Sequence, residues 1–232
     1  MPVLEAIGLD LGPGFPANAF DDTNKRVWAK VGASPTSQQF AGAWNGVALR
    51  YFAVQRRAAQ LDASLKTYSG APPPVQRAEE EDALFGLYGA ALSSIECMMF
   101  AAYFVGSIVQ PAAFPFVANL RKIDPKATGE AFALAFPGDP VVAVINGVRS
   151  APALIAISDE RNTLSHRGAP GRAHNVSIHE GASPPSPAQD STTWNLDGGL
   201  LQPGIGQARE AEIAAILSAG ITGIDAFSAG HF

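Results

Sequence analysis

The chain has 232 residues, of which 47% are hydrophobic and 16% charged, and its formal net charge is −5. This composition supplies enough apolar side chains for a buried core and excludes a largely disordered chain. The negative charge excludes a uniformly basic nucleic-acid-binding protein, so contact with a polyanion would need a local basic patch. The single cysteine, Cys97, excludes a disulfide framework and a cysteine-based zinc site, and we expect a buried, inert thiol.

The first 33 residues are rich in glycine, proline, aspartate and asparagine. Such a composition predicts an irregular N-terminal arm over 1–33, laid across the core. The first fourteen residues contain Glu5 and Asp10 and no sustained apolar stretch, which is unlike a secretory signal. The expected compartment is therefore the cytoplasm.

A long helix is predicted from Ser34 onwards. Apolar residues recur there in alternating steps of four and three as far as Tyr68. Ser34, followed by a proline, is a start signal, and Gly70 is a stop signal. Gly42 and Gly46 weaken the first turns, so the helix is free to start later than Ser34.

A second long helix is predicted after the proline-rich segment Ala71–Val75, which cannot continue the first. The acidic run Glu79–Asp82 favours a helix start, because carboxylates stabilise a helix N-terminus. The segment is apolar on most faces up to Val109, which predicts a central helix buried on all sides. Its cleanest apolar run, Cys97–Val109, is shorter than the roughly 20 residues that span a bilayer, so we expect no membrane span.

Shorter helices follow. One is predicted at about 128–136, and a second begins with Asp139 as N-cap and Pro140 in the first turn and runs to about Arg149. Ser150–Pro152 open a third, which Gly168 closes. The expected class is all-α: a helical bundle built on a long antiparallel helical hairpin.

The helical pattern stops over about 169–205. Val176 and Ile178 alternate with polar residues, as do Trp194 and Leu196, which predicts a long loop or a small β-flap. The segment 181–190 is rich in proline, serine and alanine. A last amphipathic helix is expected over about 207–229, so that residues 34–232 form a single helical domain.

Familiar catalytic motifs are missing from this sequence. There is no Glu-x-x-His pair for a di-metal site, no His-Glu-x-x-His, no phosphate loop and no nucleophile elbow. We therefore predict neither a metal nor a cofactor.

One stretch is locally basic in this acidic protein. From Arg149 to His179 it holds four arginines and three histidines against two acids. Arginine binds a phosphate through two hydrogen-bond donors, and histidine accepts or donates a proton near neutral pH. The two residue types together suit phosphodiester chemistry. Arg167, Arg172 and His174 are the candidate substrate-binding residues.

The most informative part of this stretch is 159–168, in the last turns of a predicted helix. Asn162 and His166 are four residues apart and share one side of that helix, which Asp159 extends. Arg161 lies about 140° around the axis from His166. A site that uses all three side chains therefore needs a second surface, which another copy across a two-fold axis would provide.

Glu96 is an isolated acid within the second long helix. A buried charge needs a partner, so we expect Glu96 to pair with Arg161 as a buried support. The alternative is that Glu96 faces a water-filled groove.

Arg161, Asn162 and His166 resemble the signature of the HEPN superfamily, which consists of all-α domains. That signature is an arginine, usually followed by a polar residue, and a histidine after four to six intervening residues, late in a helix. The resemblance covers roughly 34–168 and implies a metal-independent endoribonuclease that acts as a homodimer. It implies that His166 activates the ribose 2′-hydroxyl or protonates the leaving oxygen and that Arg161 stabilises the transition state. Asn162 would orient His166 or the phosphate.

Other interpretations stay open. Arg161 and His166 would also be explained by neutralising the carbonyl end of their helix. The chain would then be a non-catalytic relative that binds a nucleotide, RNA or an antitoxin-like protein partner, or a structural bundle with an accidental motif. Two further matches, Arg167 with His174 and Arg172 with His179, fall in the expected loop and are set aside.

Overall fold

The computed structural model describes the chain apart from residues 1–7, 68–71, 116–119, 167–171, 176–190 and 195–199. The chain divides into two compact units. The first comprises Met1–Phe52, Ala90–Ala156 and Glu212–Phe232, and the second comprises Ala53–Gly89 and Ile157–Ala211. The prediction of a single domain over 34–232 stays a prediction.

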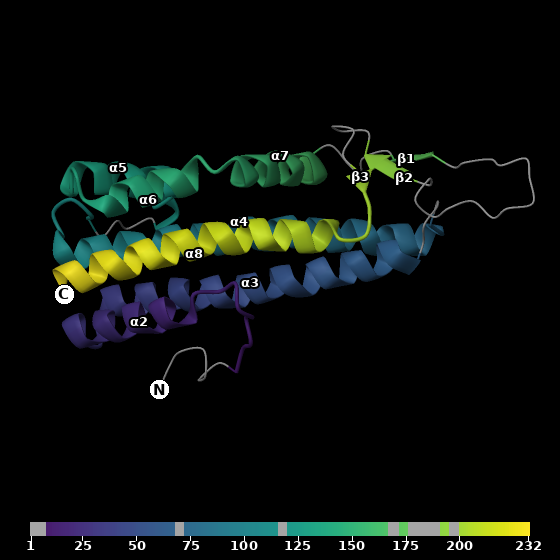
Figure 1. Ribbon diagram of the computed structural model, residues 1–232. Helices are drawn as coiled ribbons and strands as arrows, with labels where there is room; N and C mark the ends of the chain where they lie inside the picture. The colour runs from purple at the N-terminus through teal and green to yellow at the C-terminus, as the bar shows by residue number, and fades with distance from the viewer. Residues whose placement is uncertain (1–7, 68–71, 116–119, 167–171, 176–190, 195–199) are drawn as a thin grey trace, which may run out of the picture. The chain divides into compact units, whose positions relative to one another are not determined.

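The described residues are mainly helical, as Figure 1 shows. The elements are α2 (Ala17–Val31), α3 (Pro35–Thr67), α4 (Pro74–Val109), the 3₁₀ turn η1 (Leu120–Lys122), α5 (Pro125–Ala135), α6 (Pro140–Arg149), α7 (Pro152–His166), β1 (Arg172–Asn175), β2 (Ser191–Trp194), β3 (Leu200–Leu201) and α8 (Ile205–His231). The all-α class is confirmed.

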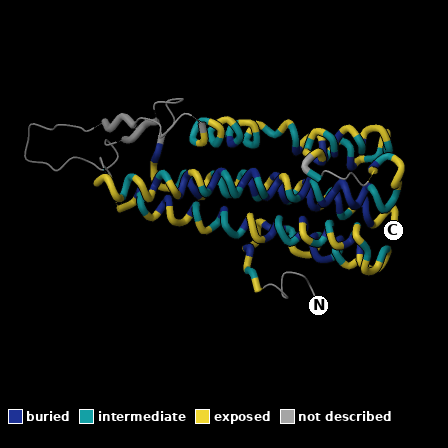
Figure 2. The backbone as a smooth tube through the Cα atoms, turned by 180° about the vertical axis from the view of Figure 1, so that it is seen from behind, coloured by how far each residue is buried: buried dark blue, intermediate teal, exposed yellow. Residues whose placement is uncertain are grey.

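The long helical hairpin is confirmed in α3 and α4. Within the second unit, Arg57 packs against Gly86, and Ser64 donates a hydrogen bond to Glu80 at 2.8 Å. Later residues of α3 thus contact earlier residues of α4, so the two helices are antiparallel. Figure 2 shows buried residues recurring along both helices.

The N-terminal segment corrects the sequence analysis, because much of the predicted irregular arm is the helix α2. Phe20 and Val27 on this helix have no exposed surface. The Phe20 ring stacks on Trp44 with centroids 4.7 Å apart, and the Trp44 indole N–H donates to the Phe20 carbonyl at 2.9 Å. Burial against α3 stabilises a sequence of modest helix propensity, which composition alone underrates.

The start of one long helix agrees with expectation, and the start of the other differs. Helix α3 begins at Pro35, so its interior glycines do not delay the start. A Cβ added at Gly46 would lie 2.9 Å from the Cys97 sulfur, so this glycine allows close approach of α4. Helix α4 begins at Pro74, before the acidic run, because proline is tolerated in the first turn of a helix.

The short helices follow their caps. The Asp139 carboxylate accepts from the Val141 amide at 2.9 Å at the start of α6, as predicted. Asp124 does the same for α5, accepting from Ala127 at 2.7 Å. Helix α7 ends at His166, and the predicted stop at Gly168 lies outside the described residues.

The expected flap is present as a small antiparallel sheet. Strand β1 pairs with β2, with Arg172 opposite Trp194, and β2 pairs with β3, a strand that the sequence analysis did not anticipate. Val176, Ile178 and Leu196, on which the flap prediction rested, lie outside the described residues.

The start of α8 is held by a buried carboxylate of α3. Asp62, only 3% exposed, accepts from the backbone amides of Gly204 at 3.0 Å, Gly206 at 2.9 Å and Gln207 at 2.9 Å. A Cβ added at Gly206 would overlap the backbone of Ala58, so only glycine permits this approach. Asp62 thus acts as a capping residue supplied by another helix.

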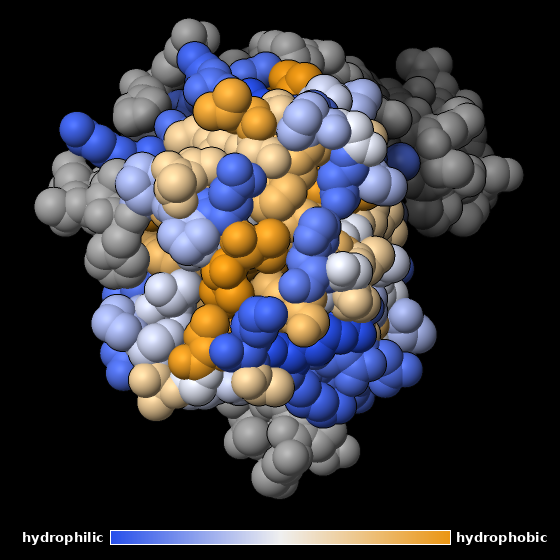
Figure 3. Space-filling model, turned by 90° about the vertical axis from the view of Figure 1, so that its left-hand side faces the viewer, coloured by the Kyte–Doolittle hydropathy of each residue, from blue (hydrophilic) through white to orange (hydrophobic). Residues whose placement is uncertain are grey.

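Three helical stretches in the described part of the chain are long and apolar enough to cross a membrane by length and composition. They are Pro74–Val109, Pro140–Ser165 and Ile205–His231, with mean hydropathies of 1.6, 1.6 and 1.5. Within the 18-residue apolar stretch of each, 61%, 22% and 50% of the residues are buried. Figure 3 shows apolar residues gathered at the centre of one face, among hydrophilic ones.

We predict that Asp62→Ala lowers the free energy of unfolding by about 2 kcal/mol, because it leaves three backbone N–H groups without their acceptor. Urea denaturation measures this change. Asp22→Asn, which alters an exposed carboxylate paired with Lys25, is the control and leaves the midpoint unchanged. Equal midpoints for wild type and Asp62→Ala would contradict this role of Asp62.

Candidate functional site

The predicted motif lies in the last turns of α7, within the second unit. Asp159 and Asn162 are exposed, and Arg161 is half-buried. The Thr163 hydroxyl donates to the Asp159 carbonyl at 3.0 Å, inside the helix. His166 is the last residue of α7, and its side chain lies outside what the structure describes.

The candidate substrate-binding residues are placed only in part. Arg172 and His174 lie on β1, where the backbone pairs them with Trp194 and Thr192 of β2. Their side chains, and the whole of Arg167, lie outside the described residues. Their roles stay predictions.

The inward side of α7 is marked by Ile157, which has no exposed surface, and by Glu160 three residues later. Residues three apart share a helix side, so these two define the packed side. Asn162 lies about 160° around the axis from Glu160, on the opposite side. The rotation of α7 therefore explains why Asn162 meets solvent.

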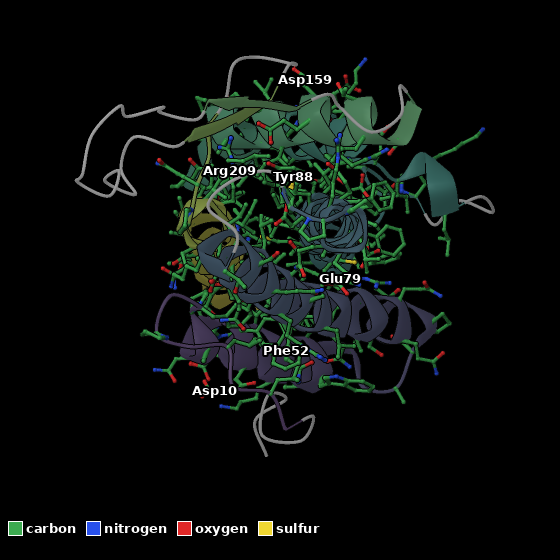
Figure 4. The ribbon with its side chains drawn as sticks, turned by 90° about the vertical axis from the view of Figure 1, so that its right-hand side faces the viewer. Asp10, Phe52, Glu79, Tyr88, Asp159 and Arg209 are labelled. Carbon is green, nitrogen blue, oxygen red and sulfur yellow. The ribbon has the colours of Figure 1, made fainter. Side chains whose placement is uncertain are left out.

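A polar cluster joins α7 to two other helices of the second unit. The Arg209 guanidinium of α8 donates to Glu160 Oε1 at 3.0 Å, and their side chains are 22% and 20% exposed. Tyr88 of α4 is 3% exposed and interacts with both. Figure 4 shows Tyr88 and Arg209 close together, with Asp159 on α7 above them.

Burial raises the pKa of the Tyr88 hydroxyl well above its usual value, and the neighbouring Glu160 carboxylate raises it further. The Arg209 charge acts in the opposite direction with smaller effect. Tyr88 therefore stays a neutral hydrogen-bonding group at every physiological pH. Glu160 Oε2 is buried and has no hydrogen-bond partner among the described residues.

Glu96 is not buried, which contradicts the expectation of a buried support and favours the alternative that it faces a groove. Glu96 is exposed on α4 and lines a pocket of about 590 Å³ in the first unit, together with Cys97 and Asp124. At the helix surface the Glu96 carboxylate remains hydrated, which avoids the free-energy cost of burying an unpaired charge. Arg161 belongs to the other unit, so pairing between them stays a prediction.

Cys97 is half-buried rather than fully enclosed, which corrects a second expectation. Desolvation by burial raises the pKa of its thiol, so it remains protonated near neutral pH. Among the described residues, no group of three or more histidine, cysteine, aspartate or glutamate side chains is arranged to hold a metal ion.

A larger groove of about 730 Å³ lies between α6 and α8 in the first unit. At one end, His231 Nε2 lies 3.1 Å from an Asp139 oxygen, and its ring packs on Phe227 with centroids 4.3 Å apart. Asp139 already caps α6 through its other oxygen. This His–Asp pair therefore serves to join two helix ends.

The sequence did not predict a role for Glu160, Arg209 or Tyr88. The available signal was the position of Glu160 between Ile157 and Leu164, on the apolar side of its helix. A charge in such a position indicates a buried partner. Which residue supplies that partner is not encoded locally, because Arg209 is distant in sequence.

We predict that Tyr88→Phe flattens the alkaline loss of stability. A raised folded-state pKa means that the contribution of Tyr88 is complete below the ordinary value of about 10 and is lost as pH rises through the folded value. Unfolding free energies measured above that pH should fall more steeply for wild type than for the variant. Tyr103→Phe should have a smaller effect, since burial alone raises the pKa of that phenol.

Identical alkaline slopes for wild type and Tyr88→Phe would contradict the burial of a neutral phenol beside Glu160.

Comparisons with protein-family models, with curated proteins and with solved structures find no match to this chain.

Proposed function

We propose that this chain is a HEPN-like, metal-independent endoribonuclease that acts as a homodimer in the cytoplasm. The supporting observation is that Asp159 and Asn162 are exposed at the end of a helix whose opposite side is held by Glu160. This leaves the side of α7 that carries Asn162 accessible to a nucleic acid or a second copy. His166 ends the same helix, four residues after Asn162.

The reaction needs only a base, an acid and a cation. One His166 imidazole takes the proton of the ribose 2′-hydroxyl, whose oxygen attacks the adjacent phosphorus. The bond from phosphorus to the 5′ oxygen breaks, and the imidazolium of the second copy donates a proton to that oxygen. The products are a 2′,3′-cyclic phosphate and a free 5′-hydroxyl, so atoms and charge balance.

Arg161 and Asn162 have supporting roles in this proposal. Arg161 places a permanent cation beside the phosphate, where negative charge builds in the transition state. Asn162 orients the imidazole or the phosphate through its amide. Further phosphates of the RNA backbone would be bound by Arg167, Arg172 and His174.

A second candidate function is RNA or nucleotide binding without cleavage, with an antitoxin-like protein as a further possible partner. The net charge of −5 favours a nucleotide or a protein partner within this second function, because an acidic protein repels a long polyanion outside any local basic patch. The cleavage experiment separates the two functions.

We predict that the purified protein cuts mixed RNA substrates in the presence of EDTA and that His166→Ala and Arg161→Ala each reduce the rate at least 100-fold. His179→Ala is the matched control, because it removes the histidine of a competing motif match and should retain the wild-type rate. Gel electrophoresis of end-labelled RNA measures the rates.

Equal cleavage by wild type and His166→Ala would end the catalytic assignment. RNA binding without cleavage by the wild type would instead support the second candidate function.

We also predict a dimer in light scattering at micromolar concentrations, because the shared site requires two motifs. A monomer at high protein concentration would contradict the mechanism.

A further inference from the structure

We propose that Glu160, Arg209 and Tyr88 are positioning residues that set the rotation of α7 and so aim the motif. The three side chains touch neither substrate nor reacting atoms in this scheme and act through the helix that carries Arg161 and Asn162. The inference rests on the proposed function for its catalytic consequence, whereas its structural part can be tested alone.

The chemistry of the pair between Glu160 and Arg209 suits a role in orientation. Glu160 and Arg209 lose most of their hydration, since each side chain is only about one-fifth exposed. Replacing a buried ion pair by well-packed apolar residues is often neutral or stabilising, so such a pair is weak evidence for stability. The pair does fix the orientation of the two side chains, because a guanidinium and a carboxylate bind only in defined geometries.

The geometry of α7 links the direction of Glu160 to that of the motif. Each residue turns the helix by about 100°, so fixing Glu160 inward also fixes the side on which Asn162 lies. The apolar residues alone define that rotation loosely. Ile157 is fully buried, but Leu164 is only half-buried. The pair between Glu160 and Arg209 fixes the rotation of α7 about its axis.

The Glu160 carboxylate has few partners. Among the described residues, Glu160 Oε2 has no hydrogen-bond partner, so the anion depends on Arg209 and on the nearby Tyr88 phenol. Tyr88 stays neutral, so it supports the carboxylate without competing for Arg209. Removal of either partner therefore releases the end of α7.

The experiment places a nitroxide spin label at the exposed motif position, as Asn162→Cys in a Cys97→Ser background. Three double variants are then compared with this protein. Glu160→Leu with Arg209→Met removes the charges, and Glu160→Arg with Arg209→Glu reverses them. Arg57→Met with Asp82→Leu is the matched control, because that pair joins two helices of the same unit but is more exposed, at 37% and 65%.

We expect the apolar double variant to keep its thermal midpoint while the label becomes more mobile in the electron paramagnetic resonance spectrum. The reversed pair should restore the wild-type line shape, and the control pair should not change it. An unchanged line shape in the apolar double variant would overturn the proposal. So would a lower thermal midpoint accompanied by no change at the label.

Cleavage kinetics of the same variants without the spin label test the catalytic part of the proposal. The apolar double variant should lower kcat at least tenfold with KM within twofold, and the reversed pair should recover most of kcat. An unchanged kcat would contradict the catalytic part of the proposal. If the wild type itself does not cleave RNA, the proposed function fails, while the label spectra still decide whether the cluster positions α7.

Discussion

The ion pair between Glu160 and Arg209 determines which side of α7 meets solvent. An exposed pair would contribute little, because water screens both charges and the side chains lose entropy when they are fixed. This pair is mostly shielded, and Tyr88 lies beside it as a neutral phenol. The accessible position of Asn162, and with it the functional proposal, depends on that constraint.

The same principle organises helix ends elsewhere in the chain. In the second unit, Asp62 satisfies three backbone amides at the start of α8. In the first unit, Arg26 of α2 pairs with Asp225 of α8, and Thr23 donates to the same carboxylate at 3.1 Å. Apolar burial brings the helices together, and a few buried polar groups fix how each helix is placed.

Local signals in the sequence predicted much of the fold. The long hairpin followed from apolar spacing, and the start of α6 followed from Asp139 and Pro140, because both depend on neighbouring residues. Helix α2 was missed, since its stability comes from packing of Phe20 on Trp44. At the candidate site, the roles of Arg161 and Asn162 stay predictions from spacing, and the pairing of Glu160 with Arg209 was missed because it depends on a contact distant in sequence.

We propose that two side chains of α7 perform phosphodiester transfer through the ribose 2′-hydroxyl. The chemical identity of the new RNA ends tests it most directly. Mass spectrometry of a defined oligonucleotide, incubated with the protein in EDTA, should detect a 2′,3′-cyclic phosphate on one fragment and a 5′-hydroxyl on the other. Fragments that carry a 5′-phosphate and a 3′-hydroxyl would contradict the account.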